Sequence, residues 1–336
     1  MPNTGDVGVV SETITPAALP LNDFGNNAKY ALGPTADQAL NPFAKGVEQN
    51  AGEKKTCQQV KTAKYKIWYD MAWGVPIDCG SGLHTSFQRL AVALSAYQKS
   101  TDVVSFSSKR DTALAEDKRS GDGKFPLTGF LADENAGHNL FYGKGGCSAC
   151  HNGLPGVLAA GFGFDDPDGT NARQLYTDSR FHNIGVPFNR EIPGLKPEDK
   201  KGLSEHVANP GLVAPGFFKT PSLRNVAKGE GKAYTHTGWF KSLKRLVHFY
   251  NTRDHFTADA NFPAIPRCET LGIINATEKE TLNSDGTTKC WPKPENENQF
   301  VAGPPLLGNL GLTDKEENQI VAYLNTLTDL HVVEAP

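Results

Sequence analysis

The sequence has 336 residues, enough to bury one large hydrophobic core or two modest ones. A formal net charge of -3 and a pI near 6.3 leave no basic signature, so nucleic acid is disfavoured as a partner. No stretch approaches the roughly 18 to 20 apolar residues of a membrane span. The first residues, MPNTGDVGVVSETITP, lack the charged and apolar regions of an export signal.

The N-terminal third predicts irregular structure followed by helices. Residues 1–55 are rich in Asn, Gly, Pro and Ala without a periodic apolar pattern, so we expect irregular structure there. A helix is predicted over 57–73 and another over 85–98, where apolar residues repeat on one face. The segment 107–126 carries mixed charges and two glycines, which is typical of a hinge. We therefore predict a partial first helical domain with its linker over 1–125.

The remaining residues, 126–336, predict a second domain that is mainly α with long loops. A short helix over 134–142 is ended by the glycine-rich run GKGG. Near the C-terminus, Thr313 and Glu316 form a capping box at the start of another helix. Its apolar face consists of Ile320, Val321, Leu324 and Leu327.

The run CSACH, between these two helices, is the most informative feature of the chain. It is a C-x-x-C-H motif, in which two thiols form thioethers with one porphyrin and the histidine ligates the iron from the proximal side. A zinc site would need a second short-spaced ligand pair, and a thioredoxin-like pair would need a βαβ context. We therefore predict haem c on Cys147, Cys150 and His151, in a cytochrome c-like domain whose first and last helices cross beside the haem.

The sixth iron ligand cannot be a methionine that follows the motif, because Met1 and Met71 both precede it. Water or another side chain must take that place. The downstream candidates are Tyr250 and the histidines His182, His206, His236, His248, His255 and His331. Helical spacing predicts an inward-facing stripe formed by Leu243, Leu246, Val247 and Tyr250. His248 would lie on the other side of that helix. The same spacing also fits a packed core tyrosine.

Four cysteines remain after haem attachment, and they form two sequence-local pairs. We predict disulfides between Cys57 and Cys79 and between Cys268 and Cys290, which would indicate an oxidising compartment. Buried free thiols are the alternative, and four cysteines allow three pairings that the sequence does not distinguish.

Five runs together resemble the C-terminal half of the bacterial di-haem cytochrome c peroxidases, the group that includes MauG. They are GKGGCSACHNG, DSRFHNIGVP, FFKTPSLRNVA, AYTHTGWFKSLKRLVHFY and GNLGLTDKEENQIVAYLNTLTD. The resemblance spans about residue 32 to the C-terminus. It implies that the C-terminal haem accepts electrons and relays them to an N-terminal peroxidatic haem. Counting from His236 in the Y-x-H-x-G run, the distal ligand position falls on Tyr250, and a tyrosine there is what MauG-like members carry.

The chain departs from this family at its N-terminal side, because no second C-x-x-C-H precedes Cys147. Gln38 and Glu48 nevertheless resemble the residues that line the peroxidatic pocket, where the glutamate acts as general base and acid on bound peroxide. Without the resemblance, Glu48 is an ordinary solvated carboxylate. The tryptophan that the family places between its haems falls on Ala28. Either the chain is a portion of a di-haem enzyme or it is a single-haem descendant.

The resemblance also implies roles for further residues at matching positions of this sequence. The TPSLRN loop packs over the haem, so Arg224 could pair with a propionate, with a surface ion pair as the alternative. The resemblance puts His182 in the wall of the same pocket, as a structural histidine or a ligand. It also implies a calcium ion between the haems, bound by backbone carbonyls at Gly231 and Ala233 and by a residue of the first haem segment.

The resemblance implies a periplasmic oxidoreductase that takes electrons from a small donor protein, a cytochrome c or a cupredoxin, and reduces hydrogen peroxide to water. It also allows a homodimer. One alternative is a mono-haem electron carrier without peroxide chemistry. Another is a MauG-like enzyme that oxidises a protein side chain. Haem attachment takes place outside the bacterial cytoplasm, so an export signal is expected although the given sequence shows none.

Overall fold

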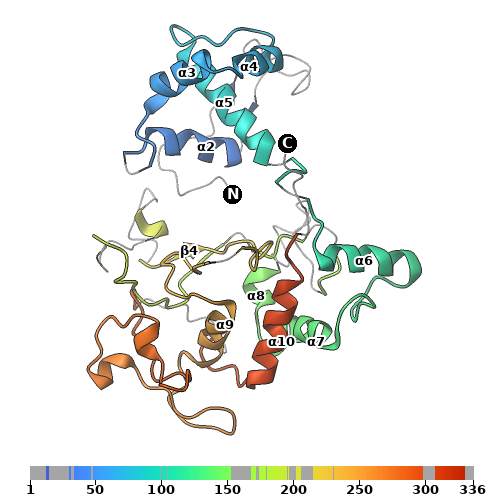
Figure 1. The fold of residues 1–336 in the computed structure, drawn as a ribbon, viewed down its shortest axis with the longest axis vertical. Coiled ribbons are helices and arrows are strands. Elements are labelled where there is room, and N and C mark those ends of the chain that lie inside the picture. The colour runs from blue at the N-terminus through green and yellow to red at the C-terminus, as the bar shows by residue number, and fades with distance from the viewer. Residues whose placement is uncertain are drawn as a thin grey trace. The chain divides into compact units, whose positions relative to one another are not determined.

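The computed structural model divides the chain into two compact units, unit 1 (Met1–Ser105) and unit 2 (Phe106–Pro336) (Figure 1). Each unit is described here by itself. The structure describes residues 13–14, 30–31, 34–46, 48–98, 100–103, 105–152, 168–171, 174–178, 180–194, 196, 202–205, 215–229, 231–297 and 307–329.

Unit 1 is helical. Its helices are α2 (Pro34–Ala44), α3 (Gly52–Thr62), α4 (Lys66–Trp73) and α5 (Leu83–Gln98). Two short antiparallel strands precede them, β1 (Thr13–Ile14) and β2 (Tyr30–Ala31). Helix α5 packs against both α2 and α3. Among the described residues of unit 1, the largest buried apolar cluster consists of Cys57, Tyr69, Trp73 and Ile77.

Two expectations for unit 1 are wrong. Residues 34–44 are helical rather than irregular, because α2 buries Ala36 and Ala39 against Ala91 of α5, and small alanines give a weak apolar pattern. The single helix expected over 57–73 is two helices, because Ala63 adopts an extended conformation that ends α3.

Unit 2 is also mainly helical, as predicted. Its helices are α6 (Lys109–Ser120), α7 (Ala132–Tyr142), α8 (Ser148–His151), α9 (Leu243–Thr252) and α10 (Asp314–Asn325). Strand β3 (Phe181–His182) pairs antiparallel with β4 (Phe218–Lys219), with His182 opposite Phe218. Short 3-10 helices occupy Leu203–Glu205, Cys268–Leu271 and Lys279–Thr281. Long loops connect these elements, in agreement with the sequence.

The expected hinge over 107–126 is wrong, because this segment contains α6. Ser108 caps that helix and exchanges hydrogen bonds with Asp111, which completes a capping box. Ala113 and Leu114 are buried in the core of unit 2, with Phe125 packed against it. The division of the chain into compact units falls between residues 105 and 106, whereas the sequence analysis placed it between 125 and 126.

Helices α7 and α10 cross at close range, and theirs is the most extensive contact between elements (Figure 1). A β-carbon at Gly137 would lie 1.9 Å from the carbonyl oxygen of Gln319, so only glycine permits this approach. Thr313 caps α10 and accepts from Glu316 N, which confirms the predicted capping box. The predicted crossing of the two helices that flank the motif is thereby confirmed.

Both predicted cysteine pairs come together. The sulfur atoms are 2.03 Å apart in Cys57 and Cys79 and 2.06 Å apart in Cys268 and Cys290. Within the described part of the chain, no helix combines the length and the apolar character needed to cross a bilayer.

Candidate haem site

Unit 2 contains a cavity of about 710 Å³ whose walls are largely apolar. The motif residues Cys147, Cys150 and His151 line it. Other walls come from Phe141 of α7 and from Ile320 of α10, so the crossing helices close one side. An apolar cavity of this size suits a flat, largely apolar macrocycle.

Local geometry presents the motif to the cavity. Gly146 has a left-handed φ of 65°, which turns the chain after the glycine-rich run and starts the single turn of α8. The i, i+3 spacing then puts Cys147 and Cys150 on one face of that turn. Burial raises the pKa of the Cys147 thiol to about 12, so the apolar pocket keeps this thiol protonated.

His151 is oriented by one short hydrogen bond, since its Nδ1 donates to the backbone carbonyl of Tyr176 at 2.7 Å. Burial lowers the pKa of His151 and favours the neutral imidazole. A neutral ring with its proton on Nδ1 keeps the lone pair on Nε2, the state in which histidine binds a metal.

Helix α9 supplies the opposite candidate ligand. All four residues of the predicted inward stripe line the cavity: Leu243, Leu246, Val247 and Tyr250. His248 instead bonds Glu317 at 2.8 Å, which confirms that it faces elsewhere. Among the described residues, none hydrogen-bonds the Tyr250 hydroxyl, and burial raises the pKa of this side chain. A polar atom left without a partner in an apolar cavity fits the position of a ligand to a metal centre.

The candidate histidines separate into three groups. His182 and His236 line the cavity, but each bonds a carboxylate, Asp178 at 2.6 Å and Glu295 at 2.5 Å respectively. His255 is buried elsewhere and contacts Asn309. His206 and His331 lie outside the described residues. The cavity therefore leaves Tyr250, His182 and His236 as the described candidates.

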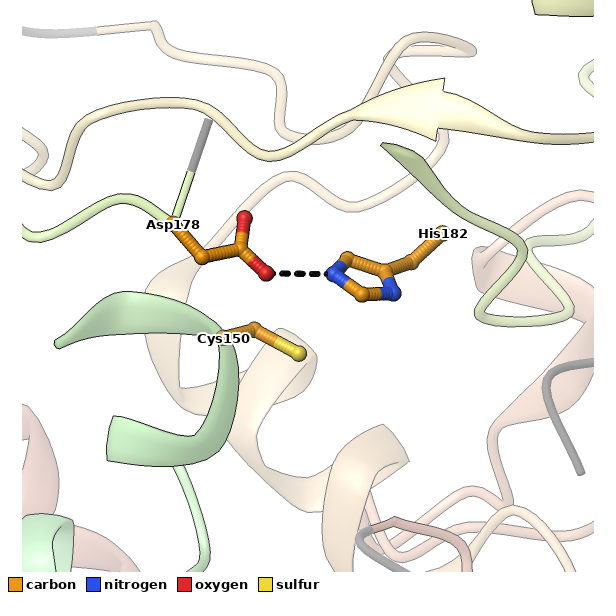
Figure 2. Close-up of side chains that lie close together, drawn as sticks. All are labelled: Cys150, Asp178 and His182. Carbon is orange, nitrogen blue, oxygen red and sulfur yellow. Dashed lines mark hydrogen bonds and ion pairs between the residues drawn. The ribbon is translucent and has the colours of Figure 1, made fainter. Parts of the chain in front are cut away.

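Asp178 and His182 form a small cluster with Cys150, whose ligand atoms all lie within 4.8 Å of one another (Figure 2). The hydrogen bond that His182 donates to the Asp178 carboxylate raises the pKa of His182 to about 9. Three such groups could hold a divalent cation, yet a thioether at Cys150 would use up that sulfur. Cys150 and His182 of this cluster line the cavity, and Asp178 lies behind His182 and bonds it. The sequence analysis missed Asp178, and helical spacing could not have found it, because no helix covers the described residues of this segment and His182 lies on strand β3.

Arg224 has a different environment from the one expected. It is not among the residues that line the cavity, and its Nη1 bonds the buried carboxylate of Asp111 at 2.5 Å. Its Nε donates to the carbonyl of Gln174 at 2.7 Å. This ion pair is largely buried, so it differs from the surface ion pair given as the alternative. The propionate role stays a prediction.

The residues predicted for the peroxidatic side belong to unit 1. Gln38 lies on α2 and Glu48 in the turn after it, and both are exposed. Neither lines the cavity of unit 2, and their roles stay predictions. Ala28 lies outside the described residues. Of the two calcium positions, Ala233 lines the haem cavity, whereas Gly231 precedes it with a left-handed φ of 63°.

The chain is similar to known haem enzymes. It is 30% identical to the methylamine utilization protein MauG of Paracoccus denitrificans over 252 residues, which are 73% of this chain and 52% of that protein. It is 31% identical to a cytochrome-c peroxidase of Denitromonas iodatirespirans over 142 residues, 36% of this chain and 31% of that protein. The chain thus spans about half the length, or less, of these curated relatives. No family model matches it.

Solved structures agree in fold. The diheme peroxidase BthA of Burkholderia thailandensis aligns with 89% of this chain and 65% of its own, at a TM-score of 0.55 and 23% identity. A variant of the same enzyme aligns with 96% of this chain and 74% of its own, at a TM-score of 0.57 and 21% identity. At this identity the likeness concerns the fold alone. Sequence similarity and fold together show that the chain belongs to the family of MauG and the di-haem cytochrome c peroxidases.

Proposed function

We propose that unit 2 is the electron-relay domain of a peroxidase, with haem c attached through Cys147 and Cys150 and held between His151 and Tyr250. Electrons would enter from a small donor protein, a cytochrome c or a cupredoxin, and leave toward a peroxidatic haem. There, hydrogen peroxide would take up two electrons and two protons to give two water molecules. The observation that carries the proposal is the single apolar cavity that gathers all four residues.

Each residue has a distinct task in this proposal. The thiols of Cys147 and Cys150 would add across the two vinyl groups, which would fix the macrocycle without a net redox change. The imidazole of His151 would hold the iron with Nε2, since Nδ1 donates to the Tyr176 carbonyl. When bound, haem c supplies one-electron iron chemistry. The apolar side chains of α9 exclude water from this site, which disfavours side reactions there.

Ligation from both faces favours electron transfer over peroxide chemistry. Peroxide activation requires an open coordination position, and His151 together with Tyr250 would leave none. For that reason we propose that peroxide reacts at a second haem, which the family implies and this sequence does not encode. Gln38 and Glu48 would serve that second haem.

The ligand assignment is tested by the Tyr250→Met variant. An anionic oxygen favours ferric iron, so its replacement by a thioether should raise the midpoint potential of the haem. A shift of about 59 mV corresponds to a tenfold change in the relative stability of the two oxidation states, and we expect at least that much. Redox titration monitored by absorbance measures it, and an unchanged potential would remove Tyr250 from the site.

Haem content is the first quantity to determine. One haem per chain, by pyridine haemochrome absorbance and intact mass, is expected after expression in a host that matures c-type cytochromes. Absence of covalent haem would overturn the proposal. Turnover of hydrogen peroxide by the chain alone with a reduced donor would contradict an exclusive relay role.

Two other functions, electron transfer by a mono-haem protein and oxidation of a protein side chain, are each favoured by one observation. A mono-haem electron carrier is favoured by the presence of one C-x-x-C-H, and such a protein would lack peroxidase activity under every condition. Oxidation of a protein side chain is favoured by the MauG match, which covers more of this chain than the peroxidase match does. Trapping of an oxidised partner protein after peroxide addition would support that second alternative.

The setting of the protein is part of the same proposal. The two close cysteine pairs support an oxidising compartment such as the periplasm, where disulfides persist. A calcium ion near Gly231 and Ala233 and a homodimer follow from the family resemblance. Metal analysis and light scattering on the purified protein would test them.

A further inference from the structure

Tyr176 has an uncommon backbone conformation next to the haem ligand. Its φ is 57°, in the left-handed region that a bulky residue seldom adopts. This conformation accompanies the hydrogen bond from its carbonyl to Nδ1 of His151, at 2.7 Å. A strained residue persists where its surroundings hold it, so the contacts around Tyr176 must hold this conformation.

The ring of Tyr176 is fully buried and held on several sides. Its hydroxyl lies 3.0 Å from the hydroxyl of Tyr323 on α10. The guanidinium groups of Arg110 and Arg224 lie 5.8 and 5.7 Å from the ring centre, within the range of a cation–π contact. The ring of Phe141 meets it edge to face at 6.0 Å. These contacts come from α6, α7, α10 and the loop that contains Arg224.

One carboxylate joins the two arginines. Asp111 accepts from Nη1 of Arg110 at 3.2 Å and from Nη1 of Arg224 at 2.5 Å. Arg110 also donates to the carbonyl of Gly169 at 2.6 Å, and Arg224 to that of Gln174 at 2.7 Å. The arginines therefore bind main-chain oxygens that precede Tyr176 in the sequence. Planar guanidinium groups provide several fixed donors, which a lysine does not.

We infer that Tyr176 is a positioning residue for His151, and that the Arg110–Asp111–Arg224 bridge holds the Tyr176 carbonyl against Nδ1 of the imidazole. The inference rests on the proposed function only in that His151 ligates haem iron. A hydrogen bond at Nδ1 makes the imidazole a stronger donor to the metal, which stabilises ferric iron. The bridge would thus act on the haem potential through the backbone hydrogen bond to His151.

The test is the Arg224→Lys variant, which keeps the positive charge and loses the forked contacts. We expect a higher midpoint potential and a several-fold faster exchange of the His151 Nδ1 proton with solvent, measured by NMR. The exchange is a readout that does not depend on the iron, because the hydrogen bond joins two residues of this chain. Haem content should stay at one per chain.

Arg245→Lys is the matched control. This arginine on α9 is also largely enclosed, donates to the hydroxyl of Thr281 at 2.7 Å and lies 4.1 Å above the ring of Trp291. It contacts neither Tyr176 nor the bridge in the described structure. We expect a loss of stability with an unchanged potential and an unchanged proton exchange.

Tyr176→Phe is the second variant, chosen in case Arg224→Lys does not fold. It removes the hydroxyl that contacts Tyr323 and keeps the ring, so the same two changes should appear with smaller size. If both variants keep the potential and the exchange rate of the unmodified chain, the inference is wrong. If the unmodified chain fails to bind haem, the proposed function is wrong, and the exchange rates in the haem-free chain still decide the inference.

Discussion

Unit 2 gathers its reactive side chains around one buried cavity, whereas those of unit 1 lie on the surface. Cys147, His151 and Tyr250 line the cavity, and burial shifts the pKa values of all three. Gln38 and Glu48 of unit 1 are exposed to water. Chemistry at a metal centre needs desolvated, fixed ligands, and within the described residues only unit 2 supplies them. The comparison indicates that packing within unit 2 alone buries the candidate ligands and fixes their positions.

The largest contrast should come from removing cysteines in each unit. The double variant Cys147→Ser, Cys150→Ser should lose covalent haem completely, since both attachment thiols are gone. The matched double variant Cys57→Ser, Cys79→Ser in unit 1 should keep one haem per chain and lose about 2–4 kcal/mol of stability. Intact mass and urea unfolding measure the two effects. Equal haem loss in both variants would contradict an independent site in unit 2.

A second contrast concerns close packing of helices. Gly137→Ala should destabilise unit 2 by about 3 kcal/mol, because its β-carbon would collide with the Gln319 carbonyl oxygen. Gly46→Ala in unit 1 is the control, since the nearest atom, Oδ1 of Asn50, would lie 3.9 Å from the new β-carbon. We expect less than about 0.5 kcal/mol there. Comparable losses in thermal unfolding would show that the crossing is looser than described.

The pair of Asp178 and His182 should make the stability of unit 2 depend on pH. The pKa of His182 rises from 6.5 to about 9 in the folded chain, because the Asp178 carboxylate accepts from the ring. This stabilisation is fully present below pH 6.5 and is lost as pH rises through about 9. We expect about 1 kcal/mol, because Cys150, the second contributor to the raised pKa of His182, would no longer contribute once its sulfur forms a thioether. Urea titrations of His182→Gln should lack this dependence, and an identical pH profile would argue against the pair.

The smallest effect is expected at Glu48. An exposed side chain without buried contacts contributes little to stability, so Glu48→Gln should change the free energy of unfolding by less than about 0.5 kcal/mol. Haem content and potential should also be unchanged. A larger loss of stability would mean that this carboxylate makes stabilising contacts. The functional side chains of unit 1 would then be held in place, as those of unit 2 are.

Local patterns in the sequence determined much of unit 2. The C-x-x-C-H motif, the Thr313 capping box and the four-residue stripe of α9 each depend on residues close together in the chain. Such features survive in the fold because one helical turn sets their geometry. Of the three cysteine pairings open from the sequence, the structure brings together the sequence-local one.

Tertiary structure alone decided the rest. The charged segment around α6 looked like a hinge because its Arg110 and Asp111 are polar, and only their partners from other loops explain their burial. The contact between Tyr176 and His151 joins residues that no pattern relates. Pairing of buried charges and main-chain groups depends on which distant segments meet, so it cannot be read from periodicity. The sequence thus determined the residues of the candidate haem site, and the tertiary structure decided how those residues are supported.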